Sequence, residues 1–304
     1  MCRSPIKYMK TLDIARSGKL LLAGILFGSN FVSAAPAQAA PKKVLVVTVT
    51  KGFRHSSIPT AERIIGELGK ESGAFTVDYA RVNPDDPQFK GADGKRDDAK
   101  VDAAIKAVLA EKMSPAALKK YDAVIFANTT GDLPLPDKEA FLDWIKSGKG
   151  FVGMHAAADT FPGFPGYTDM LGAHFKTHEA QVEVDALNQD SKFPACRHLP
   201  ADWKVFDEIY QFKNFERSKM HGLLTMDKHP NNHTPGDYPI TWCKEYGKGR
   251  VFYTSLGHRE DLWDPKWPDR KNSPEVAEAY RKHILGGIKW ALGLEKGNAK
   301  PQGQ

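Results

Sequence analysis

The chain has 304 residues and a formal net charge of +6, from 43 Lys and Arg against 37 Asp and Glu. This length suits one large α/β domain. Five basic residues and Asp13 lie in residues 1–39, so the remaining residues carry only +2 and show no basic stripe with interleaved aromatics. Because no nucleic-acid-binding motif is present either, composition and charge argue against a nucleic-acid partner.

Residues 1–39 have the pattern of a signal peptide. A basic segment precedes an apolar run at 20–28, and 37–39 (Ala-Gln-Ala) matches an A-x-A cleavage site. The run is too short to span a membrane comfortably. We expect cleavage after Ala39, a periplasmic or secreted product, and no stable membrane insertion after cleavage. An uncleaved anchor is the alternative.

Strand-like and helix-like segments alternate in the first half of the remaining chain, which we take as a single domain over residues 40–294. The predicted strands are 43–50, 75–81, 122–128 and 151–154, and the predicted helices are 58–71, 101–110 and 137–146. Continuous Val and Leu runs are typical of parallel strands covered by helices on both faces. The alternation predicts a doubly wound, mostly parallel sheet with helices on both faces.

The second half is predicted to be loop-rich. Its strand-like segments lie between loops carrying Pro, Asn, Asp and His, and we expect them to extend or edge the sheet. They are residues 181–187, 204–212, 238–243 and 250–256. A final helix is predicted from Ser273, as N-cap, to about residue 292. Residues 295–304, rich in Lys, Gly, Pro and Gln, are expected to be a flexible tail.

Three histidines follow predicted strands. His55 comes after the first strand, His155 after the fourth and His258 after segment 250–256. The carboxyl ends of parallel strands share one edge, so His55 and His155 should converge, and His258 joins them if its strand has the same sense. Neutral imidazole is both a base and a metal ligand, so the group indicates a proton-transfer or metal site. The alternative is that each ring caps a turn or bonds a backbone carbonyl.

Carboxylates near these histidines are further candidates. Alternation along 204–212 predicts that Glu208 and Tyr210 share one face and Asp207 lies on the other. A carboxylic acid beside aromatic rings can have its pKa raised enough to act as a general acid; the alternative is a solvated edge strand. Asp159 could orient the His155 imidazole or bind a sugar hydroxyl, or be an acid near a helix N-terminus.

Two other pairs carry weaker signals. His174 and His178 have the i, i+4 spacing of two zinc ligands on one helical face, but the glutamate stands after the second histidine and a strand follows. Cys196 and Cys243 could form a disulfide in an oxidising compartment or remain buried thiols. A bound divalent metal such as zinc is therefore possible, but the sequence does not define which residues would bind it.

Several kinds of chemistry are disfavoured by what the motifs lack. Arg54 and His55 occupy the turn where a dinucleotide fold needs glycines, so no nucleotide cofactor is expected. The chain has no Gly-x-Ser-x-Gly motif, and neither Cys196 nor Cys243 follows a predicted buried strand. Covalent catalysis by serine or cysteine is therefore disfavoured.

Five segments, in order over roughly residues 43–292, resemble the ThuA-like family, which is linked to trehalose utilisation. They are 52–58 (GFRHSSI), 153–155 (GMH), Phe175 with His178, 207–210 (DEIY) and 246–258 (YGKGRVFYTSLGH). The resemblance implies a flavodoxin-like fold, similar to class I glutamine amidotransferases. Since His155 stands at the strand end that holds their nucleophilic cysteine, no glutamine amidotransferase activity is expected.

The resemblance also implies a role in carbohydrate catabolism, where pathways containing such proteins oxidise disaccharides to 3-keto derivatives. We expect an enzyme acting on a glycoside or 3-keto-sugar by acid–base chemistry. The expected catalytic residues are His155, Glu208 and His258, and the expected substrate-binding residues are His55, Asp159, His178 and Tyr210. A non-catalytic sugar-binding accessory protein and a metal-dependent hydrolase are the alternatives.

Overall fold

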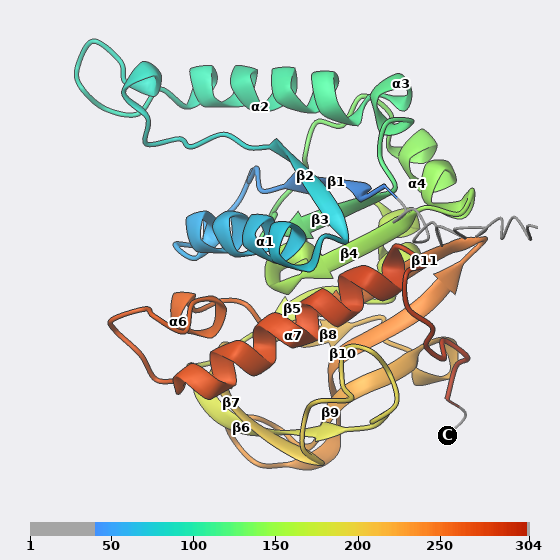
Figure 1. The fold of residues 1–304 in the computed structure, drawn as a ribbon. Helices are drawn as coiled ribbons and strands as arrows, with labels where there is room; N and C mark the ends of the chain where they lie inside the picture. The colour runs from blue at the N-terminus through green and yellow to red at the C-terminus, as the bar shows by residue number, and fades with distance from the viewer. Residues whose placement is uncertain (1–39, 303–304) are drawn as a thin grey trace, which may run out of the picture. The chain divides into compact units, whose positions relative to one another are not determined.

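The computed structural model describes residues 40–302 (Figure 1), and the predicted signal peptide lies outside this range. The strands are β1 (Lys42–Val47), β2 (Phe75–Ala80), β3 (Ala123–Ala127), β4 (Gly150–Met154), β5 (His174–Thr177), β6 (Val182–Asn188), β7 (Asp202–Asp207), β8 (Gln211–Lys213), β9 (His221–Lys228), β10 (Pro235–Tyr246) and β11 (Gly249–Thr254). The helices are α1 (Ile58–Ser72), α2 (Asp98–Met113), α3 (Pro115–Leu118), α4 (Lys138–Lys146), α5 (Pro165–Leu171), α6 (Glu260–Trp263) and α7 (Pro274–Ala291), with 3-10 turns η1 (Pro87–Phe89), η2 (His155–Asp159) and η3 (Arg217–Lys219).

One large sheet organises the domain, in the strand order β2-β1-β3-β4-β11-β10-β9-β6-β7. The first five of these strands pair in parallel, and we call them the parallel half. Their order follows the flavodoxin-like pattern, in which the chain winds outward from β1 in both directions. The α/β fold with a doubly wound sheet is therefore confirmed, and it places the carboxyl ends of β1, β4 and β11 on one edge.

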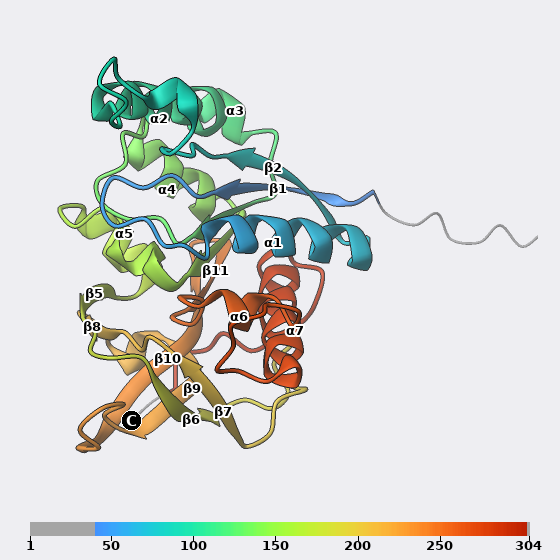
Figure 2. The ribbon, with the colours of Figure 1, turned by 90° about the vertical axis from the view of Figure 1, so that its left-hand side faces the viewer.

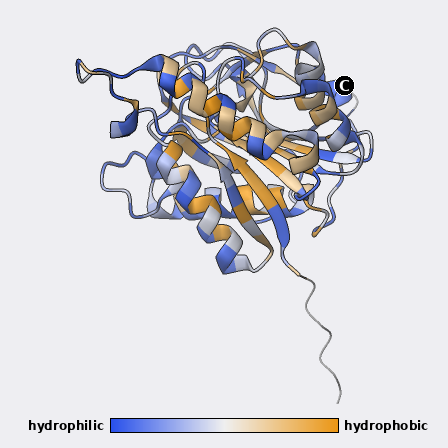
Figure 3. Ribbon diagram, turned by 90° about the horizontal axis from the view of Figure 1, so that it is seen from above, coloured by the Kyte–Doolittle hydropathy of each residue, from blue (hydrophilic) through white to orange (hydrophobic). Residues whose placement is uncertain are grey.

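Helices cover both faces of the sheet, as the continuous apolar strands predict (Figure 2). Val44 and Val46 pack in one core with α1 and α7, whereas Leu45 and Val47 face the opposite core with α2, α4 and α5. Figure 3 shows largely apolar strands in the middle of the domain, beside helices in which apolar and polar residues are mixed. None of the helices within residues 40–302 combines the length and apolar character needed to cross a bilayer.

The second half of the chain extends the sheet with β10, β9, β6 and β7, which pair antiparallel and which we call the antiparallel half. Two strands here, β9 and β5, were not predicted. The single strand predicted at 204–212 is wrong: β7 ends at Asp207, and β8 begins at Gln211 in a separate two-stranded sheet with β5. Residues 208–210, the β7–β8 linker, therefore connect two sheets.

The helical spacing of His174 and His178 does not produce a zinc site. His174 begins strand β5, and His178 lies just beyond its end. Residues i and i+4 lie about 13 Å apart along an extended strand but only about 6 Å apart along a helix, so the spacing no longer brings these two rings together on one helical face. The tertiary pairing of β5 with β8 determines the conformation here.

The chain after α7 is hydrogen-bonded along the start of β9, where we expected a flexible tail. The side chain of Gln302 donates to the Gly222 carbonyl at 3.0 Å and accepts from the Gly222 amide at 3.1 Å. His221 donates through Nδ1 to the Lys300 carbonyl at 2.9 Å. Backbone groups at the start of β9 thus find partners in the tail, which holds residues 300–302 against the antiparallel half.

Both cysteines of the described chain are free, buried thiols, so the candidate disulfide is not formed. Cys196 and Cys243 lie in the same apolar core as α7. Burial raises the pKa of each thiol well above its ordinary value. They act as small apolar core residues.

Candidate functional site

Three imidazole rings meet at the carboxyl edge of the parallel half. His55 lies in the loop after β1, His155 directly follows β4, and His258 follows β11. The ring centroids of His55 lie 4.8 Å from His155 and 5.2 Å from His258, and those of His155 and His258 are 5.3 Å apart. Because β11 is parallel to β4, His258 joins the other two, and the convergence expected from the topology is present.

His155 is held in an uncommon backbone conformation. Its φ of 46° lies in the left-handed region, which residues other than glycine seldom adopt. The Tyr253 hydroxyl donates to the His155 carbonyl at 2.7 Å, and Nδ1 of His155 lies 2.7 Å from the Ser255 carbonyl. A carbonyl only accepts, so Nδ1 carries a proton, and Nε2 faces the other members of the site. Packing and hydrogen bonds together thus fix the backbone and the orientation of the ring.

Glu208, in the β7–β8 linker, supplies a buried carboxylate to this group. Its Oε1 lies 3.3 Å from Nδ1 of His258 and 3.6 Å from Nε2 of His155, and its Oε2 lies 3.1 Å from Nδ1 of His178. Burial alone would raise the pKa of Glu208, but hydrogen bonds from His155 and His258 outweigh it and hold the pKa well below its usual range. The raised pKa expected for a general acid is therefore wrong, and Glu208 is an ionised acceptor.

Asp207 was assigned to the opposite face of a strand, yet it positions the loop that carries His258. Its buried carboxylate accepts backbone N–H groups from Gly257 at 2.7 Å, Arg259 at 3.2 Å and His258 at 3.3 Å. The only sequence signal near this loop is Gly257, because glycine tolerates turns that other residues avoid. In the structure its φ is 127°, at the turn before His258. Asp207 is a positioning residue that sequence reasoning missed.

The protonation of His258 follows from these carboxylates. Burial lowers its pKa, but the hydrogen bond to Glu208 and the negative charge of Asp207 outweigh that effect, so the pKa is raised above its ordinary value. His258 is partly exposed, with 20% of its side chain accessible. His258 therefore holds a proton more readily than a free imidazole does, and it has access to solvent.

His55 has the opposite environment. Burial, followed by the positive charge of His155 and His258, pushes its pKa far below the usual value, so the ring is neutral. Its Nδ1 is buried without a hydrogen-bond partner. Phe53 packs edge-on against this ring at 4.8 Å and is 67% exposed. Buried polar atoms normally have a hydrogen-bond partner, and a ligand bound beside Phe53 would supply the partner that this nitrogen lacks.

Tyr210 and His178 flank the cluster on the side of the small sheet. The Tyr210 ring lies 4.2 Å from the His155 ring and 4.4 Å from that of Phe175, centroid to centroid. Burial raises the pKa of the Tyr210 phenol, so it stays protonated. His178 is exposed and reaches the cluster through Glu208. Both residues therefore contact the predicted catalytic groups.

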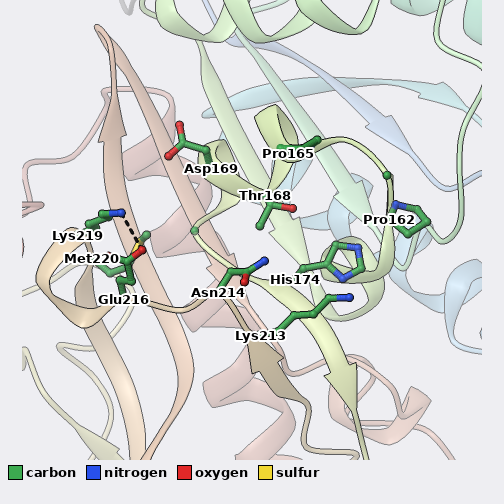
Figure 4. A pocket seen from close by; sticks show the side chains of 12 residues that line it. Pro162, Pro165, Thr168, Asp169, His174, Lys213, Asn214, Glu216, Lys219 and Met220 are labelled. Carbon is green, nitrogen blue, oxygen red and sulfur yellow. Dashed lines mark hydrogen bonds and ion pairs between the residues drawn. The ribbon is translucent and has the colours of Figure 1, made fainter.

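Asp159 does not orient His155, because Nδ1 of that ring is bonded to the Ser255 carbonyl. Burial raises the pKa of the Asp159 carboxyl, although the charges of His174 and Lys213 oppose the shift. These two residues, cross-strand partners in β5 and β8, line a neighbouring pocket of about 450 Å³ (Figure 4). Asp159 thus interacts electrostatically with two residues that line this pocket.

Four residues bring ligand-type atoms together at the strand ends, and we call them the histidine–glutamate cluster: His55, His155, Glu208 and His258. One nitrogen or oxygen from each lies within 4.8 Å of all the others. Such a set can exchange protons with a bound molecule or coordinate a cation.

Comparison with known proteins places the chain in a family. The chain is similar to two solved ThuA-like proteins: one from Parabacteroides merdae, 19% identical with a TM-score of 0.60 (83% of this chain, 90% of that chain), and one from Bacteroides uniformis, 21% identical with a TM-score of 0.57 (85% and 95%). These likenesses concern the fold alone. No curated protein matches the chain. The model of the ThuA family, described as trehalose utilisation, matches residues 43–291, and the chain therefore belongs to the ThuA family.

Proposed function

We propose that the protein is an enzyme of carbohydrate catabolism that acts on a glycoside or 3-keto-sugar at the histidine–glutamate cluster. The observation that carries this proposal is a buried carboxylate, Glu208, with imidazole nitrogens of three histidines 3.1–3.6 Å from its oxygens. Carboxylate and imidazole groups in such contact suit proton exchange with a substrate. The family's link to trehalose utilisation supports a sugar as that substrate.

A 3-keto group suggests the reaction, because it acidifies the C–H bond at the neighbouring carbon C2. Glu208 would accept the C2 proton, the C–H electron pair would form the C1–C2 double bond, and the C1–O bond would break. His258 would donate its proton to the departing glycosidic oxygen, which leaves as an alcohol. The elimination thus needs one base and one acid on the cluster, with no covalent enzyme intermediate.

Aromatic rings beside the cluster could hold the sugar. Phe53 is 67% exposed and packs against His55, so one of its faces can receive the apolar face of a pyranose ring. The protonated phenol of Tyr210, whose ring lies tilted against that of His155, could position the sugar ring from the other side. These contacts would orient the substrate over the Glu208 carboxylate.

The test compares Glu208→Gln with Glu183→Gln on 3-keto-glycosides. Glu208→Gln keeps the side-chain shape and removes the base, so kcat should fall by roughly 10²–10⁴-fold. Glu183 is exposed on β6, and its variant should match the wild type. A wild type that binds sugar without turning over any 3-keto-glycoside would instead favour the non-catalytic binding protein.

We also propose that the protein is exported, with cleavage after Ala39, because residues 1–39 carry a basic segment, an apolar run and an A-x-A site. Its substrate would then be met in the periplasm or outside the cell. Amino-terminal sequencing of protein from the periplasmic and medium fractions should find Ala40 first, and a retained Met1 would contradict the cleavage.

A further inference from the structure

We infer that the histidine–glutamate cluster is a binding site for a divalent transition-metal ion, with Zn²⁺ as the reference ion. The inference concerns the same location as the proposed function and deepens it, but it rests on the spacing of the ligand atoms and does not require turnover. Three imidazoles and one carboxylate are a donor set that zinc takes in proteins, and other divalent ions of the first transition row accept the same ligands.

The distances fit a tetrahedral ion. Bonds of about 2.1 Å to nitrogen and oxygen place the ligand atoms of a tetrahedral site roughly 3.4 Å apart. In the cluster, Nδ1 of His258 lies 3.3 Å from Nε2 of His155 and 3.3 Å from Oε1 of Glu208, and the latter two atoms are 3.6 Å apart. Three ligand atoms thus form a nearly equilateral triangle of the size that a bound ion needs.

His55 is the fourth member. Its ring stands nearly perpendicular to those of His155 and His258, with interplanar angles of 87° and 89°, and the latter two are inclined by 80°. Rings arranged edge-to-face in this way can all direct a nitrogen at one point. His55 is neutral and buried, and no protein group is hydrogen-bonded to its Nδ1, so its contacts leave the ring free to take part in ligation.

Outer contacts of the kind that support metal ligands are also present. Nδ1 of His155 donates to the Ser255 carbonyl, which leaves Nε2 free to ligate. Oε2 of Glu208 faces His178 at 3.1 Å while Oε1 faces the cluster. Asp207 fixes the backbone on either side of His258. These neighbouring groups therefore orient the ligand side chains without a bound ion.

Metal loading changes the roles of the histidines. Nε2 of His155 and Nδ1 of His258 would be occupied as ligands, whereas His178 lies on the far oxygen of Glu208 and is exposed. Proton exchange in the loaded protein would then use Glu208 with His178. His178→Gln should consequently retain zinc affinity within about tenfold, the lower end of outer-contact effects, while Glu208→Gln should not.

The experiment titrates Zn²⁺ into chelator-treated mature protein by calorimetry and measures bound metal by elemental analysis. We expect one ion per chain and at least a 100-fold weaker affinity for Glu208→Gln and for His258→Gln. His233→Gln, which changes an exposed histidine away from the cluster, should bind as the wild type does. Circular dichroism of each variant checks folding, and Glu208→Gln, being nearly isosteric, keeps the test decisive if His258→Gln unfolds.

The possible results separate the two proposals. A wild type that binds no zinc, cobalt or manganese, or variants that bind zinc as tightly as the wild type, would overturn the metal site even if sugar turnover is found. Zinc bound with the expected variant pattern, without turnover of any 3-keto-glycoside, would support the metal site and contradict the proposed reaction. Co²⁺ substitution adds a readout independent of activity, because visible absorption bands report four- or five-coordinate geometry.

Discussion

The two halves of the sheet contribute differently to the site. The parallel half supplies imidazoles, since His55, His155 and His258 each follow one of its strands, and the crossover topology alone brings those strand ends together. The linker that leaves the antiparallel half supplies the carboxylate of Glu208. The preceding residue, Asp207, holds the His258 loop by hydrogen bonds to its backbone. The regular parallel half therefore presents the imidazoles, and the linker that leaves the antiparallel half adds the negative charge of Glu208.

If this division is right, the largest effect outside the cluster should come from Asp207→Asn. The amide can accept where the carboxylate did, but its NH₂ group faces backbone donors, so about 2–4 kcal/mol of unfolding free energy should be lost. Displacement of His258 should lower kcat at least tenfold with little change in KM. Urea denaturation and steady-state kinetics on a 3-keto-glycoside measure the two effects.

The control for this variant is Asp185→Asn, which breaks an exposed ion pair with Lys204 on the antiparallel half. It should cost at most about 1 kcal/mol and leave kcat unchanged. If Asp207→Asn lost stability while zinc affinity and kcat were those of the wild type, Asp207 would be only a core residue. The antiparallel half would then contribute Glu208 alone.

A smaller effect is expected from Gln302→Ala, which tests whether the tail supports the antiparallel half. The substitution removes hydrogen bonds to both backbone groups of Gly222 and one from Arg217, so the free energy of unfolding should fall by about 1 kcal/mol. Hydrogen exchange should quicken in β9 and remain unchanged in β1. Gln88→Ala, at an exposed position near the parallel half, is the matched control; equal losses in both variants would contradict a role for the tail.

The smallest effect should be electrostatic and pH-dependent. Burial raises the pKa of Asp237, but Arg217 outweighs it and lowers the pKa below its ordinary value. A lowered native pKa contributes stability above the unfolded value of about 3.9, and this contribution disappears as the pH falls through that value toward the native one. Asp237→Asn should therefore be up to about 1 kcal/mol less stable than the wild type at pH 7 and equal to it at low pH.

Urea unfolding at several pH values measures this difference, with the exposed Asp227→Asn on β9 as the control that should follow the wild type throughout. A stability gap between wild type and Asp237→Asn that persists at low pH would mean that the ion pair is not its origin. Added salt should narrow the gap at pH 7, because surface charges are screened.

The sequence predicts the parallel half of the sheet better than the antiparallel half. Buried parallel strands carry a continuous Val and Leu signal, and histidines at their ends must share an edge, so the first half of the fold and three members of the cluster were accessible to prediction. Segment 204–212 alternates without a visible break, and only pairing with two different partners ends β7 at Asp207. Spatial neighbours also set the pKa of Glu208, and no local pattern encodes their distances.

The two free cysteines have a consequence for how fast the newly made chain must fold. Thiolates, not thiols, react with oxidants, and burial keeps Cys196 and Cys243 protonated in the native core. The unfolded chain lacks this protection. In an oxidising compartment the protein would therefore have to fold faster than its thiols are oxidised, because a disulfide formed early would replace the two free thiols of the native core. Rapid folding, which buries both thiols, would then protect them from oxidation.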